Sequence, residues 1–555
     1  MSLATSIKIA GRDIAVPVTL TDRLVNWMSP IAGAKRYRQR VATAMLGGIA
    51  GGYSGADRTR RANQRGRVRE MDADSAILPD LVTLREESQH MLRNNAVAVG
   101  AVKTNITKVV GTGLKAKPQI DRKILNLTSE QADSWEDAAL REYLLATETR
   151  EFDYERQLPF SLQQGLIFLK SLEDGDIFIN LPRLKRPGSP YNLKLQLIEA
   201  ARVCNKDMAT DTISLAGGIA RDSNGAPEKI HVLNVHPGNW RTVPSQMRNE
   251  WIWQELDLFQ KNSGAPLCLH LFDKCRPGQS RGVPYIAPVV ELIKQLGRYT
   301  DAEVMAAVVS GMFSVFVTNE TGSPNFGPAA NIDNPTGDPT KQVDTTGLEL
   351  GYGSVIGLLP GESISTAAPG RPNVAFDPFV MAILRQIGIA LELPFEILIK
   401  HFTASYSAAR AALEEAWDYF NRRRHWLVTM LCQPVYEAVI TEAVALGRLS
   451  APGFFADPLI KKAWLSAIWI GDAPSQIDPV KEIEAATARI DARISTREEE
   501  RARLLGEPWE PIVPQIIKEE KLLAGLPTKE VPTDPQKKNQ PPANNNDPGG
   551  DTENN

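Results

Sequence analysis

Cysteine and histidine are scarce in this 555-residue chain, which holds four cysteines and six histidines. So few cysteines build no disulfide framework, and scattered thiols are typical of proteins from a reducing compartment. Cys268 and Cys275 lie seven positions apart, but no second cysteine pair or His-x₃₋₅-His motif accompanies them to complete a zinc site. We therefore expect no metal site.

Long apolar runs and nucleotide-binding motifs are also missing. Asp13 and Asp22 interrupt the N-terminal region, so we expect no signal peptide. The weakly polar stretches 41–56 and 302–317 are too short or too rich in glycine to span a bilayer, so we expect no membrane association. The sequence contains no Walker A, H-E-x-x-H or EF-hand motif, and Gly111-Thr112-Gly113 lacks the third glycine of a dinucleotide site. We expect no cofactor and no ATP-driven motor.

The charge of the chain is unevenly distributed. Residues 1–70 carry thirteen basic and four acidic side chains, a net +9, so the other 485 residues carry −12 of the total of −3. We predict that residues 1–75 form a basic, flexible arm, because they show no long apolar face. The arm either contacts nucleic acid or an acidic partner, or only solubilises the protein. Its candidate contact residues are Arg36, Arg38, Arg40, Arg58, Arg60, Arg61, Arg65, Arg67 and Arg69.

The rest of the chain has the composition of a globular protein, with 43% hydrophobic and 23% charged residues. Short apolar runs between Ile177 and Trp253 are bounded by turn residues and predict strands, and Asn224-Gly225 predicts a hairpin. The flanking regions have helical periodicity. We therefore predict the α+β class, with a β-rich middle.

Two expected helices enclose a turn-rich segment. Residues 286–311 form one helical run, and Asp377-Pro378 predicts the start of the second, with the Asp side chain as its cap. Two antiparallel helices with an inserted β lobe predict a protruding stalk. A long helix begins at Ser405 or Ser407, and Pro434 is expected to kink it.

Two motifs suggest chemistry but also have structural explanations. Gly278–Gly282 reads G-x-S-x-G, so a serine hydrolase using Ser280 is an alternative function. Against it, Val283-Pro284 delays the following helix, and the downstream histidines have no clear aspartate partner. Arg422, Arg423 and Arg424 could contact phosphates, although Asp418 four residues earlier favours an ion-paired helix face. A nucleic-acid-binding scaffold protein that uses the basic arm is the other alternative.

The order of several short motifs resembles that of the lambda-type portal proteins of tailed bacteriophages, from about residue 25 to 525. The matching stretches are Arg93-Asn94-Asn95, Val110–Gly113, Gly175–Phe178, Leu197–Glu199, Cys275–Pro284, Tyr299–Glu303, Ala306-Ala307, Leu393–Glu396, Ser405–Arg410 and Ile477–Glu482.

The resemblance implies a phage portal fold made of a wing, paired stem helices, a β-containing clip, a tunnel loop, a long kinked helix and a helical crown. It places the wing at residues 76–285, the stem at 286–311 and 373–392, the clip at 312–372, the tunnel loop at 393–405, the long helix at 406–449 and the crown at 450–525. Residues 526–555 are expected to be a disordered tail.

The resemblance also implies a function without catalysis. Such a protein forms a ring, typically a dodecamer, at one capsid vertex, through which viral double-stranded DNA enters during packaging and leaves at ejection. The expected partners are further copies of the chain, the terminase large subunit, the major capsid and scaffold proteins, and head-tail adaptor proteins. The expected location is the virion, and the host cytoplasm during assembly. The tunnel-loop residues expected to face DNA are Lys400, His401 and Phe402.

Overall fold

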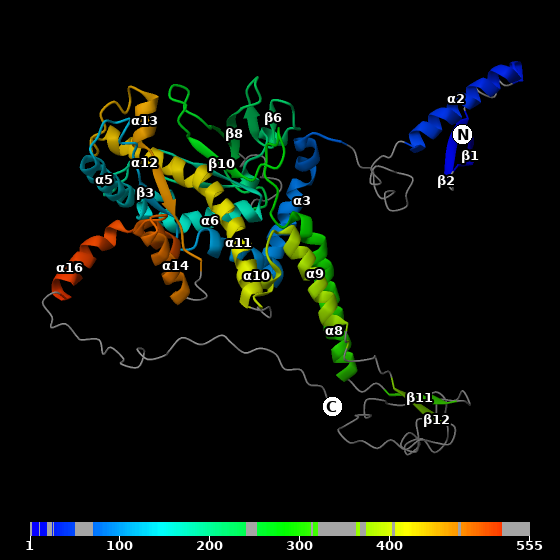
Figure 1. The fold of residues 1–555 in the computed structure, drawn as a ribbon. Coiled ribbons are helices and arrows are strands. Elements are labelled where there is room, and N and C mark those ends of the chain that lie inside the picture. The colour runs from blue at the N-terminus through cyan, green and yellow to red at the C-terminus, as the bar shows by residue number, and fades with distance from the viewer. Residues whose placement is uncertain are drawn as a thin grey trace, which may run out of the picture. The chain divides into compact units, whose positions relative to one another are not determined.

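The computed structural model describes residues 3–9, 12–18, 21, 25, 27–49, 70–239, 252–311, 315–319, 362–366, 373, 375–401, 406–474 and 479–523. The chain divides into two units, Met1–Met71 and Asp72–Asn555 (Figure 1).

The N-terminal unit contains regular structure that the prediction of a flexible arm did not anticipate. Strands β1 (Leu3–Ile9) and β2 (Arg12–Val18) form an antiparallel hairpin in which Ile7 pairs with Ile14, and α2 (Pro30–Ile49) lies against β2. The apolar residues of the hairpin alternate with small or polar ones, which is the period-two signal of a strand.

Helices supply many of the core residues of the second unit. Asn95 separates α3 (Ala73–Asn94) from α4 (Ala96–Val109), because its side chain accepts hydrogen bonds from the first backbone N–H groups of α4. Helices α5 (Ser129–Thr147) and α6 (Phe160–Glu173) follow, and α5 begins with a capping box at Thr128. Buried residues of these helices belong to one core cluster, among them Val102, Ile167 and Phe168.

The β-rich middle is confirmed. Antiparallel strands β10 (Cys268–Phe272), β4 (Asp176–Asn180) and β5 (Gln196–Glu199) form one sheet, with β4 in the centre. A second sheet contains β6 (Leu215–Ala216), β7 (Ile219–Arg221), β8 (Pro227–Leu233) and β9 (Trp253–Asp257). The hairpin predicted at Asn224-Gly225 joins β7 to β8, with Gly225 at φ 81°.

The two predicted stalk helices are α8 (Val290–Gly311) and α9 (Phe376–Ala390), which run side by side (Figure 1). They meet at Tyr299. The centre of its ring lies 5.7 Å from the ring centre of Phe376 and 4.8 Å from that of Phe379. The predicted Asp377 cap is wrong: Ala375 precedes α9 without a side-chain hydrogen bond, and Asp377 lies inside the first turn. Strands β11 (Val315–Asn319) and β12 (Glu362–Thr366) pair between the helices, and residues 320–361 lie outside the described part.

The predicted long helix is α11 (Tyr406–Leu427) followed by α12 (Gln433–Ala445), joined by a π turn at Val428–Cys432 just before Pro434. Of the two residues predicted to start the helix, Ser405 lies outside the described residues and Ser407 lies inside α11, after Tyr406. Within the described chain, one helix, Arg410–Ala445, is long and apolar enough to cross a membrane by composition alone. Half of its most apolar window is buried, and Phe420, Leu431 and Tyr436 pack into the main core, which accounts for its hydropathy.

The region from residue 450 onward first adds a helix and a strand to the main core and then forms three further helices. Helix α13 (Pro458–Trp464) and strand β13 (Ala467–Ile470) join the main core, and β13 pairs with β3 (Lys115–Pro118). Helices α14 (Pro479–Asp491), α15 (Arg497–Leu505) and α16 (Val513–Leu523) follow. The predicted tail at 526–555 lies outside the described residues.

Candidate functional site

Lys400 and His401 lie at the C-terminal end of a short helix, α10 (Phe395–Ile399). Both side chains are exposed, and Lys400 has φ 56°, a left-handed conformation that is uncommon outside glycine. The helix is anchored by buried Ile397 and Leu398, so these two polar residues project from a fixed base. Phe402, the third predicted tunnel-loop residue, lies outside the described residues.

Arg422 lies next to this segment, where it forms an exposed ion pair with Glu392. Its guanidinium is also 5.8 Å from the ring centre of Tyr419. Glu392 itself has φ 53°, so left-handed residues bound the α10 segment at both ends. The structure thus brings one of the three consecutive arginines close to the predicted tunnel loop.

The other two arginines hold the fold together. The Arg423 guanidinium lies 2.6 Å from the carboxylate of Asp273. Arg424 donates to the backbone carbonyls of Lys108, Val109 and Asp472, at 3.0 to 3.1 Å, and so closes the C-terminal end of α4. The predicted intramolecular use of the cluster is therefore observed for all three residues, but with partners from other elements instead of Asp418.

Of the basic residues in the N-terminal unit, Arg36 and Arg38 are exposed on α2. The side chain of Arg40 and the whole cluster Arg58, Arg60, Arg61, Arg65, Arg67 and Arg69 lie outside the described residues.

In the described part of the chain, the serine of the G-x-S-x-G segment is bound to an aspartate and an arginine. The Ser280 hydroxyl donates to Asp74 at 2.7 Å, its backbone N–H donates to the same carboxylate, and Arg221 contacts both side chains. Among the described residues, its hydrogen-bond partners include no histidine to act as general base. A 3-10 turn at Ala287–Val289 follows the motif, and α8 begins at Val290, four residues after the predicted start at residue 286. The helix is thus delayed, as expected, and does not begin at the serine.

Ser280→Ala is therefore expected to lower the free energy of unfolding by about 1 kcal/mol, through the lost hydroxyl hydrogen bond to Asp74. Hydrolysis of a nitrophenyl ester by the variant is expected to match that by the wild-type protein. Chemical denaturation and an esterase assay measure the two quantities, with exposed Ser263→Ala as the matched control. A loss of ester hydrolysis in the Ser280 variant alone would restore the hydrolase alternative.

The residue after Ser280 belongs to a buried network of charges. The Asp176 carboxylate receives hydrogen bonds from Arg281 at 2.5 Å and Arg85 at 2.8 Å, and His270 Nε2 lies 3.1 Å away. Arg281 also donates to three backbone carbonyls at 2.7 Å, those of Ala200, Val203 and Gly217. The network joins α3, β4, β10 and the turn that leads into α8.

Burial would raise the pKa of Asp176, but the positive charges of Arg281 and Arg85 and the hydrogen bond from His270 outweigh it and hold this pKa well below its usual value. Burial lowers the pKa of Arg85 to about 10, against the attraction of Asp176. Burial also lowers the pKa of His270. These values describe a structural ion cluster in which Asp176 stays ionised and His270 stays neutral near pH 7.

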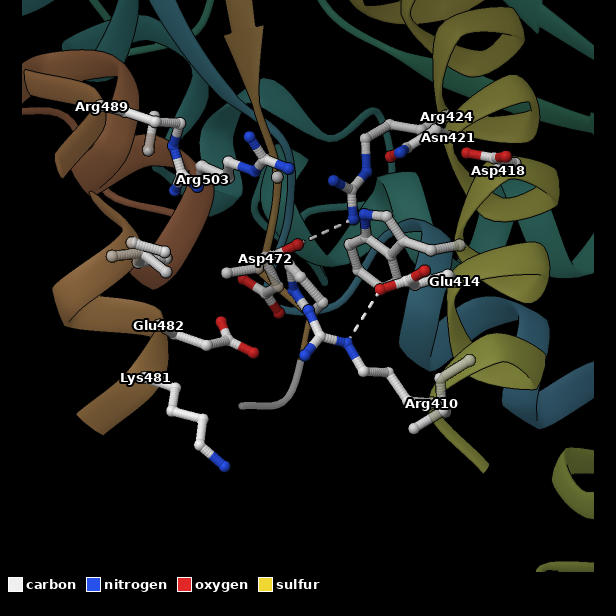
Figure 2. Close-up of a pocket in the computed structure, with 18 residues that line it drawn as sticks. Arg410, Glu414, Asp418, Asn421, Arg424, Asp472, Lys481, Glu482, Arg489 and Arg503 are labelled. Atoms are coloured by element: carbon white, nitrogen blue, oxygen red, sulfur yellow. Dashed lines mark hydrogen bonds and ion pairs between the residues drawn. The ribbon is translucent and has the colours of Figure 1, made fainter. Parts of the chain in front are cut away.

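An open cavity of about 820 Å³ separates α11 from α14 and α15 (Figure 2). Both acidic and basic side chains line it, and Figure 2 shows Arg424 directed toward Asp472 and Arg410 toward Glu414. Arg489 is held by Glu500 at 2.6 Å. Within the described residues, no group of three or more His, Cys, Asp or Glu side chains is placed to hold a metal ion.

Sequence reasoning overlooked Asp176 and Asp472. Thr112 donates to Asp472 from both its backbone N–H and its hydroxyl, at 3.0 and 2.9 Å. A Cβ at Gly111 would lie 1.9 Å from the same carboxylate. The close contact with Asp472 therefore explains the glycine at position 111. The Gly111-Thr112-Gly113 motif was the only feature of the sequence that could have indicated this contact.

Comparison with known proteins gives the same family for most of the chain. Residues 59–424 match the family model described as "Phage portal protein, lambda family". The portal protein of Escherichia phage N15 is 24% identical over 477 residues, covering 82% of this chain and 87% of the relative. Portal protein B of Escherichia phage lambda is 23% identical over 471 residues, covering 82% and 86%. A chain from the virion of a native gene transfer agent particle superposes with a TM-score of 0.41 at 13% identity, covering 78% of this chain and 94% of that one. The assignment to a family rests on the family model and on the sequence relatives.

Proposed function

The chain belongs to the lambda family of phage portal proteins, and from this we propose that it forms a ring at one vertex of a phage capsid. The ring, for which we propose twelve subunits, is the passage for double-stranded DNA during packaging and ejection. The observation that carries this proposal is the family match over residues 59–424, which runs from the α3 region through the paired helices to the long helix.

The fold of the second unit supports this assignment of parts. Helices α8 and α9 run side by side, and Asn373, just before α9, donates to Glu303 of α8 at 2.6 Å. We assign them as the stem and the segment between them, which contains β11 and β12, as the clip. In this proposal the clip contacts the terminase during packaging and head-tail adaptor proteins afterwards.

The charge of the chain suits a conduit that must not hold DNA tightly. Each phosphate that a fixed cation neutralises strengthens binding and steepens its salt dependence, so a channel lined with lysines would stall the moving duplex. Residues 71–555 carry −12 in total, and Lys400 and His401 are the polar side chains proposed to face DNA at the end of α10. Sparse cations at one level of the channel would steady DNA and still let it slide.

Replacing both residues, Lys400→Ala with His401→Ala, is expected to reduce the DNA that filled particles retain. The reason is the loss of one phosphate contact per subunit, which would lower the slope of log binding against log salt by about 0.9 for each contact. DNA retained per particle, measured after a nuclease challenge, tests this, with exposed Lys261→Ala as the control. Unchanged packaging and retention would remove Lys400 and His401 from the proposed channel.

The remaining assignments follow from the same proposal. The family is a structural one, and the proposed role requires no catalysis by this chain. The exposed Arg36 and Arg38 on α2 would face DNA, the scaffold protein or the major capsid protein. The protein would reside in the virion, after assembly in the host cytoplasm.

A further inference from the structure

Between β4 and β5 the chain forms an antiparallel excursion, residues 182–194, which we call the basic loop. Arg183 forms a bridge with Leu193 across the loop. The turn at its tip is Arg186–Ser189, in which the N–H of the last residue donates to the carbonyl of the first at 3.2 Å. The two central residues of this turn are proline and glycine, and Gly188 has φ 79°, as the third position of a type II turn requires.

Two basic residues hold the loop in place. The Arg186 guanidinium donates to the backbone carbonyls of Asp153 at 2.9 Å and Tyr154 at 2.5 Å. The ammonium group of Lys194, which is buried, donates to the carbonyl of Tyr191 at 2.8 Å. Because these contacts are made within the chain, the loop has little conformational freedom left to lose when it binds a partner.

Two other basic residues of the loop face solvent. Arg183 and Lys185 are exposed, and among the described residues neither side chain has a hydrogen bond or an ion pair. Arg150, in the segment that Arg186 contacts, is likewise exposed and without a partner in the described chain. These positive charges are therefore not used to stabilise the fold.

The basic loop and the neighbouring segment 150–156 are positively charged within a body that is negatively charged. Together they hold six basic side chains against three acidic ones, a net +3, namely Arg150, Arg156, Arg183, Lys185, Arg186 and Lys194 against Glu151, Asp153 and Glu155. Glu151 already pairs with two of the arginines, and the carboxylate of Asp153 accepts from backbone N–H groups of its own segment. Within the described chain, this leaves Glu155 as the one acid of the two segments without a partner.

The basic loop lies far from the proposed DNA contact at the end of α10. Glu442 of α12 accepts hydrogen bonds from the N–H groups of Asn192 and Leu193, at 2.7 and 3.0 Å. Arg422, beside α10, comes about twenty residues earlier in the same long helix, which corresponds to about 30 Å at the rise of an α-helix. The two sites therefore cannot contact the same few phosphates.

We propose that Arg183 and Lys185 bind the phosphate backbone of double-stranded DNA at this second site, outside the channel. Fixed cations are all that a phosphate contact requires, whereas a protein partner also needs an apolar centre to bury. The loop exposes one large apolar side chain, Leu184 at 40%. The inference rests on the proposed function for the presence of duplex DNA beside the chain, and it goes beyond passage through the ring.

Removal of the two cations tests the contact. The full-length protein is mixed with a covalently closed circular duplex, which cannot thread an intact ring and so reports contacts outside the channel. Arg183→Ala with Lys185→Ala is expected to weaken binding about tenfold at about 0.2 M salt and to lower the slope of log binding against log salt by about 1.8, for two lost phosphate contacts. Lys206→Ala with Lys261→Ala, which removes two exposed cations from other loops, is the matched control. Circular dichroism checks folding.

A charge-conserving exchange separates charge from shape. Arg183→Lys with Lys185→Arg is expected to bind the circle with wild-type affinity and salt slope. Failure of the wild-type protein to bind the circle, or equal binding by the alanine variant and the control, would overturn the proposal. Unchanged DNA binding with lost binding to polyglutamate would also overturn it, and would assign the loop to an acidic protein surface. Negative-stain microscopy scores ring formation separately, so the absence of wild-type rings would refute the proposed function, while a loss of DNA binding by the loop variant would still support this second site.

Discussion

Asp176→Asn is expected to lower the free energy of unfolding by about 3 to 5 kcal/mol, the cost of leaving a buried charge without its partner. The substitution hardly changes the shape of the side chain, but it removes the negative charge between Arg85 and Arg281. Both guanidinium groups are buried, so water cannot replace the lost partner. Chemical denaturation of the purified chain measures the change.

The control for this prediction is Asp273→Asn, which makes the same chemical change in a carboxylate that is 56% exposed and paired with Arg423. Arg423 is only 13% exposed, but water can reach the open Asp273 carboxylate, so we expect its loss to cost about 1 kcal/mol, less than the loss of Asp176. Similar losses for the two variants would mean that the buried network contributes no more than a surface ion pair.

Gly282→Ala is expected to cost about 3 kcal/mol or more, because the added methyl group meets backbone. A Cβ at this position would lie 1.9 Å from the carbonyl oxygen of Gly175 and 2.8 Å from Cβ of Phe272. Neither atom belongs to the end of a flexible side chain, so β4 and the turn before α8 would have to separate. The free energy of unfolding and the yield of soluble protein both report this effect.

Gly278→Ala provides a matched control in the same turn. Gly278 has φ 75°, but nothing lies within 4 Å of the Cβ that alanine would add. Its cost is therefore the left-handed backbone alone, about 1 to 2 kcal/mol. If Gly282→Ala cost no more than Gly278→Ala, close packing against Gly175 would not explain the glycine at position 282.

The sequence patterns predicted the features that depend on neighbouring residues. The period-two runs in the middle of the chain, the Asn224-Gly225 hairpin and the two stalk helices are all local signals, and the structure contains them. The capping prediction at Asp377 failed, because the N-cap position is Ala375, two residues earlier, and it makes no side-chain hydrogen bond.

The candidate site was harder to predict, since its geometry depends on residues far apart in the chain. Asp176 meets Arg85 from 91 positions before it and Arg281 from 105 positions after it. Arg422 had Asp418 at ideal helical spacing, yet it pairs with Glu392 from the end of α9. Spacing along the chain identifies possible ion-pair partners, but the tertiary fold determines which of them lie close enough to pair.

The pairing of β3 with β13 has a consequence for synthesis of the protein. Thr112 and Asp472, which meet beside this sheet, lie 360 residues apart. At about 5 to 20 residues per second, the ribosome needs on the order of 20 to 70 s to make the intervening chain. Throughout that time the edge of β3 is open to other strands, so the nascent chain passes through an aggregation-prone stage before its own C-terminal third closes it.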